Sequence, residues 1–178
     1  MAFDASMNTF RANHNRFLKM TLFVFTDGAA SKNGAADCEA AWAVFFTEQD
    51  RRNCSGKIES APSNQKAELY AIHRALQMTA GERDVTVVTD SKYSIDCLTK
   101  WYKAWEQNGW VTAKGEPVKH ADIIKESLAL IQHPSEPRVK FLHVNSHRKK
   151  PNKSEQQEMM FWHGNDQADQ LARRVLGR

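Results

Sequence analysis

The stretch FVFTDG at residues 23–28 is echoed by VVTDS at residues 87–91. Each is an apolar run followed by Thr, Asp and a small residue, which is typical of a buried strand that runs into a turn. A helical pattern separates the two runs, so a right-handed crossover would make them parallel neighbours in one sheet. Because open α/β sheets place their chemistry at the carboxyl edge of such strands, we expect Asp27 and Asp90 to lie side by side.

Hydrophobic periodicity predicts the remaining elements. Strands are expected at residues 22–26, 41–46, 52–57, 85–89 and 139–144. Helices are expected between a cap at Ser63 or Asn64 and a stop at Gly81, at 91–98, 101–108 and 121–132, and from Asn165 onward. The strands come first as an antiparallel meander and then alternate with helices, which predicts an α/β fold with a mixed sheet and helices packed on it.

The composition bounds the class of protein. A chain of 178 residues suits one domain with a real core, and its net charge of +4 fits a polyanionic partner. The three cysteines have no metal-like spacing, which indicates reduced thiols and an intracellular protein. The longest clean apolar run near the start is Leu22–Phe25, which excludes a signal-peptide core or a membrane span there. Residues 1–20 are interpreted as a flexible tail; a mitochondrial presequence and a start at Met20 are the alternatives.

Two further acids complete a constellation. Glu68 lies in NQKAELYAI on the crossover helix, and Asp169 lies in GNDQADQLA beside the apolar stripe of the last helix. Clustered carboxylates repel one another and stay ionised together when cations neutralise them. All-oxygen ligands favour Mg²⁺ or Mn²⁺, and two such ions can clamp a phosphodiester. Taken singly, each acid is better interpreted as a turn residue, a cap or a surface charge. Taken together, they favour the metal site, because all four can be placed at one edge of one sheet.

The chain resembles the ribonuclease H family, type 1 branch. The matching motifs occur in family order: FTDGAASKNG, SNQKAELYAI, VVTDSKYSI, WYKAWEQNGW, HVNSH and GNDQADQLA. They cover most of residues 21–177, and residues 21–178 are interpreted as a single catalytic domain. The resemblance implies a five-stranded sheet of order 3-2-1-4-5 with helices on both faces. It also implies a monomeric endonuclease that hydrolyses the RNA strand of RNA–DNA hybrids and leaves 3′-hydroxyl and 5′-phosphate ends.

The resemblance assigns roles to individual residues. Asp27, Glu68, Asp90 and Asp169 are the implied ligands of two Mg²⁺ ions, for which Mn²⁺ can substitute, whereas Asp166 is a neighbouring acid outside the set. His147 matches the family's mobile histidine and is a candidate general acid, since an imidazole titrates near working pH. His143 falls inside the last strand and is expected to be structural.

Other matches concern the nucleic acid. Asn33, Asn64 and Gln65 correspond to residues that contact 2′-hydroxyls, which mark RNA and suit amides that both donate and accept. Ser63 corresponds to a phosphate-pocket residue, and His120 stands where the family often has Asn. A basic protrusion at about residues 99–119 is implied to grip the DNA strand. Its region supplies the candidate contacts Tyr93, Trp101, Trp105, Lys100 and Lys103. The alternative is that its tryptophans are core and its lysines are merely solvated.

Residues 148–163 (RKKPNKSEQQEMMFWH) depart from the family pattern. They are predicted to form a long flexible loop, basic at its start and hinged at Met159–Trp162, with an added substrate contact as one interpretation. Two rival functions are an inactive hybrid-binding module and a junction resolvase on the same fold. The four acids argue against the first, and the 2′-hydroxyl residues argue against the second.

Overall fold

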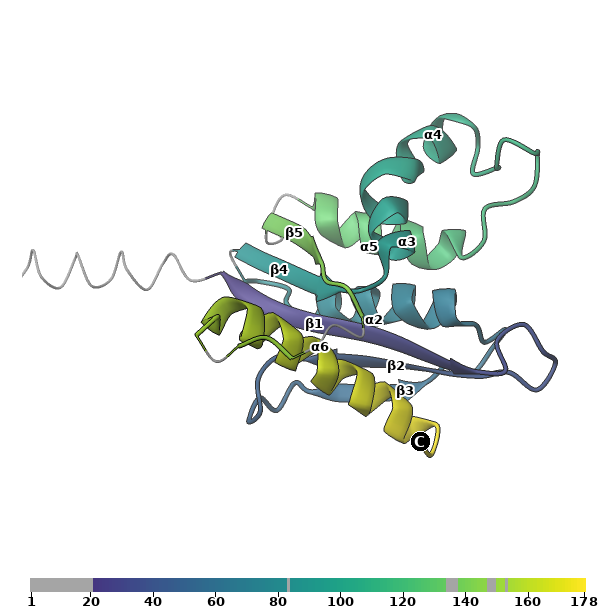
Figure 1. Ribbon diagram of the computed structural model, residues 1–178. Helices are drawn as coiled ribbons and strands as arrows, with labels where there is room; N and C mark the ends of the chain where they lie inside the picture. Colours follow the sequence, from purple (N-terminus) through teal and green to yellow (C-terminus); the bar gives the residue numbers. More distant parts are fainter. Residues whose placement is uncertain (1–20, 83, 134–137, 147–149, 153) are drawn as a thin grey trace, which may run out of the picture.

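The computed structural model describes residues 21–178 apart from 83, 134–137, 147–149 and 153 (Figure 1). In that part of the chain, five strands form one sheet in the order β3-β2-β1-β4-β5, as predicted. The strands are β1 Leu22–Ser31, β2 Glu39–Phe45, β3 Cys54–Lys57, β4 Asp84–Thr89 and β5 Arg138–His143. The first three are antiparallel, and β1, β4 and β5 run parallel, so the sheet is mixed.

The central strand β1 continues further than the sequence indicates. It pairs with β4 only as far as Thr26↔Thr89, but with β2 as far as Ser31↔Glu39. Asp27 therefore lies inside a strand, and the expected turn after Thr26 is wrong. Since β4 ends at Thr89, Asp27 is the first β1 residue without a β4 partner, at an open edge of the sheet.

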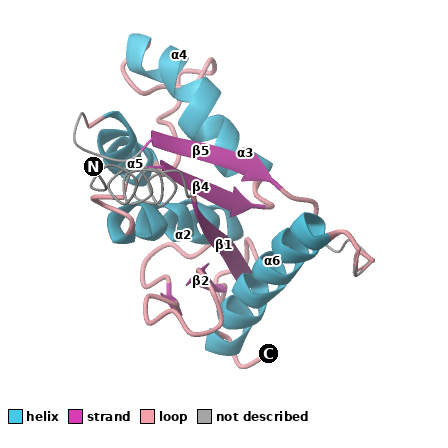
Figure 2. Cartoon of the chain, turned by 90° about the vertical axis from the view of Figure 1, so that its left-hand side faces the viewer, coloured by secondary structure: helices cyan, strands magenta, loops and turns pink. Residues whose placement is uncertain are grey.

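The helices are α2 Asn64–Met78, α3 Lys92–Asp96, the π-helical turn η1 Cys97–Trp101, α4 Tyr102–Gln107, α5 Ala121–Gln132 and α6 Gln156–Val175. Figures 1 and 2 show α2 and α5 on one face of the sheet and α6 on the other, with α4 on a protrusion beyond β5. The sequence predicted separate helices at 91–98 and 101–108. In the structure, η1 joins them without a break.

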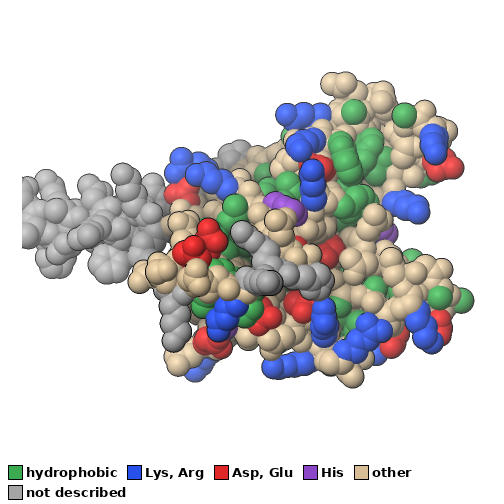
Figure 3. Space-filling model, in the orientation of Figure 1, with side chains coloured by type: hydrophobic (Ala, Val, Ile, Leu, Met, Phe, Trp, Pro, Cys, Tyr) green, Lys and Arg blue, Asp and Glu red, His purple; other side chains and the backbone are tan. Residues whose placement is uncertain are grey.

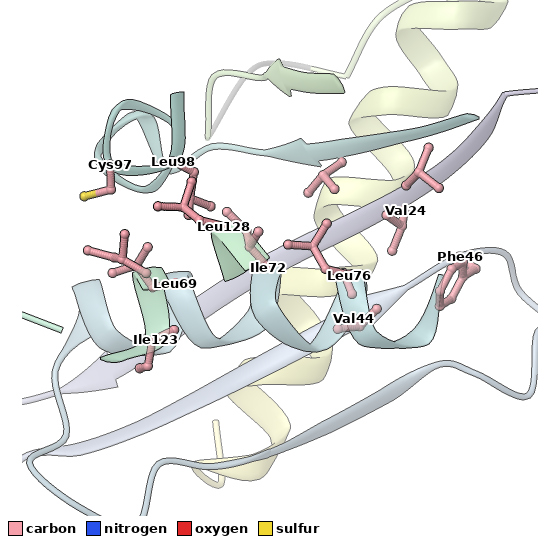
Figure 4. Close-up of a cluster of buried hydrophobic side chains, with 14 of the residues drawn as sticks. Val24, Val44, Phe46, Leu69, Ile72, Leu76, Cys97, Leu98, Ile123 and Leu128 are labelled. Carbon is pink, nitrogen blue, oxygen red and sulfur yellow. The ribbon is translucent and has the colours of Figure 1, made fainter. Parts of the chain in front are cut away.

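Alternation along the strands builds a core on each face of the sheet. Val24 and Val44 point toward α2 and α5, where they meet Leu69, Ile72 and Leu128 (Figure 4). Their sequence neighbours Phe25 and Phe45, with Val88 and Ala168, form the second core beneath α6. Each fully buried aliphatic side chain contributes about 1.5–3 kcal/mol, so the two cores fix the sheet from both sides.

The start of α6 corrects the prediction for residues 148–163. The helix begins at Gln156, so the expected hinge at Met159–Trp162 is instead part of its first turns. The reason is packing: Phe161 meets Phe23 with ring centroids 5.5 Å apart. One turn further on, Gly164 lies against Phe25 so closely that a Cβ there would come within 2.4 Å of the ring. Within the apolar run, Phe161 is therefore a helical contact with β1, and the run is not a hinge.

Two other expectations concern the whole chain. No described helix combines the length and the hydropathy that crossing a membrane requires. The three cysteines form no disulfide. The predicted tail at residues 1–20 lies outside the described residues.

Candidate active site

The open edge of the sheet carries three carboxylates, which we call the acidic trio: Asp27 on β1, Glu68 on α2 and Asp90 directly after β4. One ligand oxygen from each lies within 4.8 Å of the other two. Asp27 is 4% exposed and Glu68 is 6% exposed, whereas Asp90 is half-buried. The structure thus brings together Asp27 and Asp90, which follow similar apolar runs, and Glu68, which is 41 residues after Asp27 in the chain.

Gly28 allows α2 to approach β1 closely enough to bring Glu68 into the trio. A Cβ on Gly28 would lie 2.4 Å from the Glu68 backbone nitrogen and 2.8 Å from the Ala67 carbonyl carbon. Both atoms are backbone, so neither could move aside as a side-chain end would. Gly28 also forms backbone hydrogen bonds with the Asp27 and Glu68 carboxylates, which lower their pKa values and partly offset the cost of burying them.

Burial and mutual repulsion dominate the electrostatics of the trio. Burial raises the pKa of Asp27 well above its ordinary value, and the charges of Asp90 and Asp169 raise it further. The pKa of Glu68 is raised in the same way, by burial and then by Asp27 and Asp90. Burial also raises the pKa of Asp90, although a hydrogen bond from Ser146 opposes it.

The donor set suits a divalent cation. Among the described residues, Oε2 of Glu68 is a buried oxygen without a hydrogen-bond partner. A buried orphan oxygen beside two further carboxylates is costly unless a cation accepts its charge. Oxygen-only sites of this kind are typical of Mg²⁺ and Mn²⁺ and not of softer metals.

Asp169 lies next to the trio without joining it. Its charge and a side-chain hydrogen bond both raise the pKa of Asp27, so the two carboxyl groups face each other. Its Oδ1 also accepts a 2.7 Å hydrogen bond from Nε of Arg173, one turn further along α6. Asp166 lines the same cleft, and its carboxylate accepts a hydrogen bond from Gln170.

The four acids border a cleft of about 680 Å³. Its wall includes Asn64 and Gln65 at the start of α2, Tyr93 on α3, and Trp162 on α6. The cleft is therefore lined by amides and aromatics as well as by charge, which suits a polar polymer better than a small apolar ligand.

The start of α2 holds several of the predicted nucleic-acid contacts. Oδ1 of Asn33 accepts a 3.1 Å hydrogen bond from the Asn64 backbone N–H, so the structure brings these two amides together. Oγ of Ser63 caps the helix by accepting from the Lys66 backbone N–H at 3.1 Å. Both side chains therefore have a structural role in addition to any role in binding.

His120 immediately precedes α5 with a left-handed backbone, φ 59°. Burial lowers its pKa, and the positive charge of Lys66 lowers it further. Lys66 was not among the predicted site residues. Its position three residues after the capping Ser63 was the available signal, since a helix N-terminus with a nearby cation favours anions.

The protrusion carries a continuous aromatic row, formed by Tyr93, Trp101, Trp105 and Trp110, whose successive ring centroids lie 5.9, 5.9 and 6.4 Å apart. Trp101 is 42% exposed, whereas Trp105 and Trp110 pack against the main core. Figure 3 shows basic and apolar side chains together on this upper lobe. The alternative of core tryptophans therefore holds for Trp105 and Trp110, while a contact between Trp101 and the DNA strand stays a prediction.

The basic residues of the protrusion are divided in the same way. Nζ of Lys100 pairs with Asp96 at 2.6 Å, and Lys103 is exposed on α4. Nζ of Lys125, from α5, lies 4.6 Å from the centre of the Trp110 ring. Lys103 is thus the better placed of the two predicted lysines to meet a phosphate.

The two histidines of HVNSH have different outcomes. A ring nitrogen of His143 lies 3.1 Å from the Asp90 backbone oxygen, which links the end of β5 to the residue after β4 and fits the structural role expected of it. His147 lies outside the described residues, so its role as a general acid stays a prediction.

Two residues near the acids were missed by sequence reasoning. Arg173 binds Asp169, and Trp162 lines the cleft two helical turns before Asp169. The signal for Trp162 was present in its spacing: seven residues separate it from Asp169, which places both on one helical face. The interpretation of 148–163 as a loop concealed that relation.

The fold and the acids define a class, that of nucleases built on a five-stranded mixed sheet with carboxylates at its open edge. A family model described as RNase H matches residues 19–176. The chain therefore belongs to the ribonuclease H family, as its motifs predicted. Its relatives in this family are named ribonuclease H, which confirms the predicted enzyme class, a ribonuclease.

Individual relatives agree with the family model. The chain is 36% identical over 152 residues to the ribonuclease H of Schizosaccharomyces pombe. The aligned region covers 85% of this chain and 51% of that protein. It is 34% identical over 155 residues to the ribonuclease H of Parvibaculum lavamentivorans, with 86% and 90% covered. The chain thus spans about half of one relative and nine-tenths of the other.

A solved structure supports the fold independently. The foamy viral protease-reverse transcriptase in complex with RNA/DNA hybrid superposes with a TM-score of 0.64 at 19% identity. The match covers 89% of this chain and 20% of that one. At this level of identity the likeness concerns the fold, which agrees with the predicted strand order.

Proposed function

We propose that this chain hydrolyses the RNA strand of RNA–DNA hybrids and leaves 3′-hydroxyl and 5′-phosphate ends. The observation that carries the proposal is the acidic trio, whose three ligand oxygens lie within 4.8 Å of one another at the open sheet edge. The named relatives are ribonucleases H, and the foamy viral neighbour was solved with an RNA/DNA hybrid. Both support a hybrid as the substrate.

Asp27, Glu68 and Asp90 would hold divalent cations, with Asp169 as a further ligand. We propose two Mg²⁺ ions, with Mn²⁺ able to substitute. When bound, such ions supply an activated water and stabilise the leaving oxygen of the phosphodiester. The chain's own contribution is to gather the carboxylates in a buried place, so that they bind cations strongly and orient the phosphate between β1 and β4.

Recognition of RNA is assigned to the amides at the start of α2. Asn64 and Gln65 line the cleft beside the acids, and Asn33 is held against Asn64. Because the side-chain Oδ1 of Asn33 accepts a hydrogen bond from the Asn64 backbone N–H, the side-chain NH₂ group of Asn33 is the part that can bind a 2′-hydroxyl. Several amides in a row would read consecutive ribonucleotides, which separates an RNA tract from DNA.

The DNA strand is assigned to the protrusion and to the phosphate pocket. Ser63, Lys66 and His120 lie together at the start of α2 and α5, where helix N-termini favour a phosphate. Trp101 and Lys103 are exposed on the protrusion and suit a sugar–phosphate backbone. His147 is proposed to donate a proton to the leaving oxygen or to assist product release.

The proposal extends to the state of the protein. Three cysteines without a disulfide support an intracellular, reducing environment. A monomer suffices, since all four acids come from one chain.

A cleavage assay on four substrates tests the function: RNA–DNA hybrid, RNA duplex, DNA duplex and a four-way junction, each with and without Mg²⁺. The proposed function predicts Mg²⁺-dependent cleavage of the hybrid alone. Binding of the hybrid without cleavage would identify an inactive hybrid-binding module. Preference for the junction would identify a resolvase.

A further inference from the structure

We propose that Trp162, together with Lys150, forms an additional contact for the sugar–phosphate backbone of the RNA strand, beside the scissile phosphate. The inference rests on the proposed function and adds a substrate contact to the same cleft. Both residues belong to the segment that departs from the family pattern, and both lie in the described part of the chain.

The face of α6 that carries Trp162 is the face that lines the cleft. Trp162, Asp166, Asp169 and Arg173 are spaced by four, three and four residues, which puts them in one stripe along the helix. All four line the cleft. The seven residues from Trp162 to Asp169 correspond to about 10 Å along the helix axis, so the indole stands close to the acids.

The neighbouring stripe fixes the direction in which Trp162 points. Phe161 packs on Phe23, and Gly164 is pressed against Phe25, so the first turns of α6 are clamped to β1. Figure 1 shows this end of α6 beside the start of β1. Because the clamped stripe faces the sheet, the adjacent stripe with Trp162 is held at the cleft without further ordering on binding, which lowers the entropic cost of a contact.

Trp162 and the amides at the start of α2 lie on opposite sides of the acids. Along β1, Phe161 is level with Phe23, whereas Asn64 is bound to Asn33 beyond the far end of the strand. Asp27 lies between those two levels. An RNA strand that contacts Asn64 and the acids would therefore continue toward Trp162.

The chemistry of the pair suits a nucleic-acid backbone. Nζ of Lys150 lies 5.3 Å from the centre of the Trp162 ring, within the range of a cation–π contact. The ammonium would neutralise a phosphate, and the indole, which is half-buried, would pack on the adjoining ribose. An aromatic face and a cation presented together are the combination by which proteins track a strand without reading its sequence.

The test compares Trp162→Ala with two controls. Trp162→Phe keeps an aromatic face, and Met160→Ala removes a 39% exposed side chain from the opposite side of the same helix. Trp162→Ala should raise KM for the hybrid about tenfold, which is ~1.4 kcal/mol, with kcat within about twofold of the parent. Phe should restore most of the loss, and Met160→Ala should change neither constant.

Lys150 supplies a second, independent measurement. Lys150→Ala should make the dependence of log KM on log salt concentration shallower by about one unit, because one phosphate contact is lost. Lys150→Arg should keep the parent slope. This readout does not depend on the stability of the variants, so it holds if Trp162→Ala folds poorly.

Binding without turnover separates this inference from the proposed function. Fluorescence anisotropy of a labelled hybrid is measured in an Asp27→Asn background, with and without Trp162→Ala. If the parent binds hybrid but does not cleave it, the proposed function fails, while a tenfold loss of binding with Trp162→Ala still supports the contact. If the parent cleaves hybrid and both Trp162→Ala and Lys150→Ala leave KM, binding and salt slope unchanged, the contact alone is overturned. A parent that neither binds nor cleaves hybrid overturns both.

Discussion

The acidic trio lies in the cleft, whereas the aromatic row borders the cleft only at Tyr93 and continues along the protrusion. The side chains of the two groups affect the folded state in opposite ways. The trio concentrates like charge in a buried place, and burial and repulsion raise the pKa values of all three acids. The row extends from the exposed Trp101 to Trp105 and Trp110, which pack on the core. The trio therefore lowers the stability of the folded protein, and its value lies in its chemistry. Most of the aromatic row adds to stability, and the exposed Trp101 is available for binding.

The largest expected effect comes from the trio. Asp27→Asn should reduce hydrolysis of a hybrid by more than about 10³-fold, because it removes the charge that the bound cations and the phosphate transition state require. The variant should fold normally and keep its affinity for hybrid within a few-fold. Single-turnover rates in Mg²⁺ measure the loss, and Glu106→Gln, which alters an exposed acid on α4, is the matched control. Near-parent turnover in Asp27→Asn would remove Asp27 from the site.

Gly28 tests how narrowly the trio is positioned. Gly28→Ala places a Cβ 2.4 Å from the Glu68 backbone, so α2 or β1 must shift. A displacement of about 1 Å at a catalytic group can cost about 10²-fold in rate, and overpacking costs about 1–3 kcal/mol of stability.

Gly81→Ala provides the matched control for that variant. Gly81 has φ 85° and open space around its Cα, so alanine there strains the backbone without pushing on the site. We expect Gly81→Ala to lose stability and to keep its kcat. Equal losses of kcat in both variants would show that the rate reports general destabilisation, and the positioning role of Gly28 would be dropped.

The contrast between the trio and the row also shows what the sequence could foretell. The repeat around Asp27 and Asp90 was enough to predict their meeting, because a parallel pair of strands forces two equivalent positions to one edge. Glu68 followed from its place on the crossover helix. The strand order and four of the five strand positions needed only periodicity and the family motifs, since buried apolar runs leave little choice of face.

Other features depended on contacts that a linear pattern does not encode. The extension of β1 past Asp27 arises from its pairing with β2, which overrides the turn tendency of Asp and Gly. The start of α6 at Gln156 depends on Phe161 meeting Phe23, a partner 138 residues away. The division of the tryptophans into core and surface depends on which rings pack against the main core, and periodicity within so short a helix could not decide it.

Trp105 should show the stabilising side of the row. It packs against the core and lies between Trp101 and Trp110. Because the side chain is half-buried, Trp105→Ala should cost about 2 kcal/mol, less than a fully buried tryptophan, and lower Tm by about 4–8 °C. Thermal and urea unfolding measure the loss. A parent-like Tm with a raised KM would instead make Trp105 a substrate contact.

The acidic trio, unlike Trp105, should lower the stability of the folded state, and by an amount that depends on pH. The folded-state pKa of Asp27 is raised, chiefly by burial and then by Asp90, so the folded protein binds protons more tightly than the unfolded chain. This stabilising contribution is complete below about pH 4, the ordinary carboxyl pKa, and is lost as pH rises through the raised value. Without metal, Asp27→Asn should therefore be more stable than the parent at pH 8, where the parent's carboxylate is charged and buried.

The difference between Asp27→Asn and the parent should shrink toward zero as the pH falls to 4. Adding Mg²⁺ at pH 8 should stabilise the parent more than the variant, because a bound cation removes the repulsion that the variant already lacks. Unfolding curves at four pH values, with chelator or with Mg²⁺, measure both effects. A difference that is constant with pH would contradict the raised pKa of Asp27.

Substitution of Trp101 should give the smallest effect. It tests the comparison of trio and row most sharply, because Trp101 is in ring contact with the row and is also exposed at the surface. Its ring is 42% exposed, and Tyr93 and Trp105 each meet one side of it at 5.9 Å. Since much of the ring is already covered, Trp101→Ala should raise KM by about threefold to tenfold, near 1 kcal/mol, the low end for a ring that packs on nucleic acid. Its kcat should not change, because the contact lies away from the scissile phosphate. The same variant should lower Tm by no more than about 2 °C, in contrast to Trp105→Ala.

Titrating labelled hybrid into the Asp27→Asn background, with and without Trp101→Ala, measures the change in hybrid affinity without turnover. If Trp101→Ala lowers Tm as much as Trp105→Ala and leaves KM unchanged, the whole row is a packing element, and the hold on the DNA strand must come from Lys103 and the pocket at Ser63 and His120.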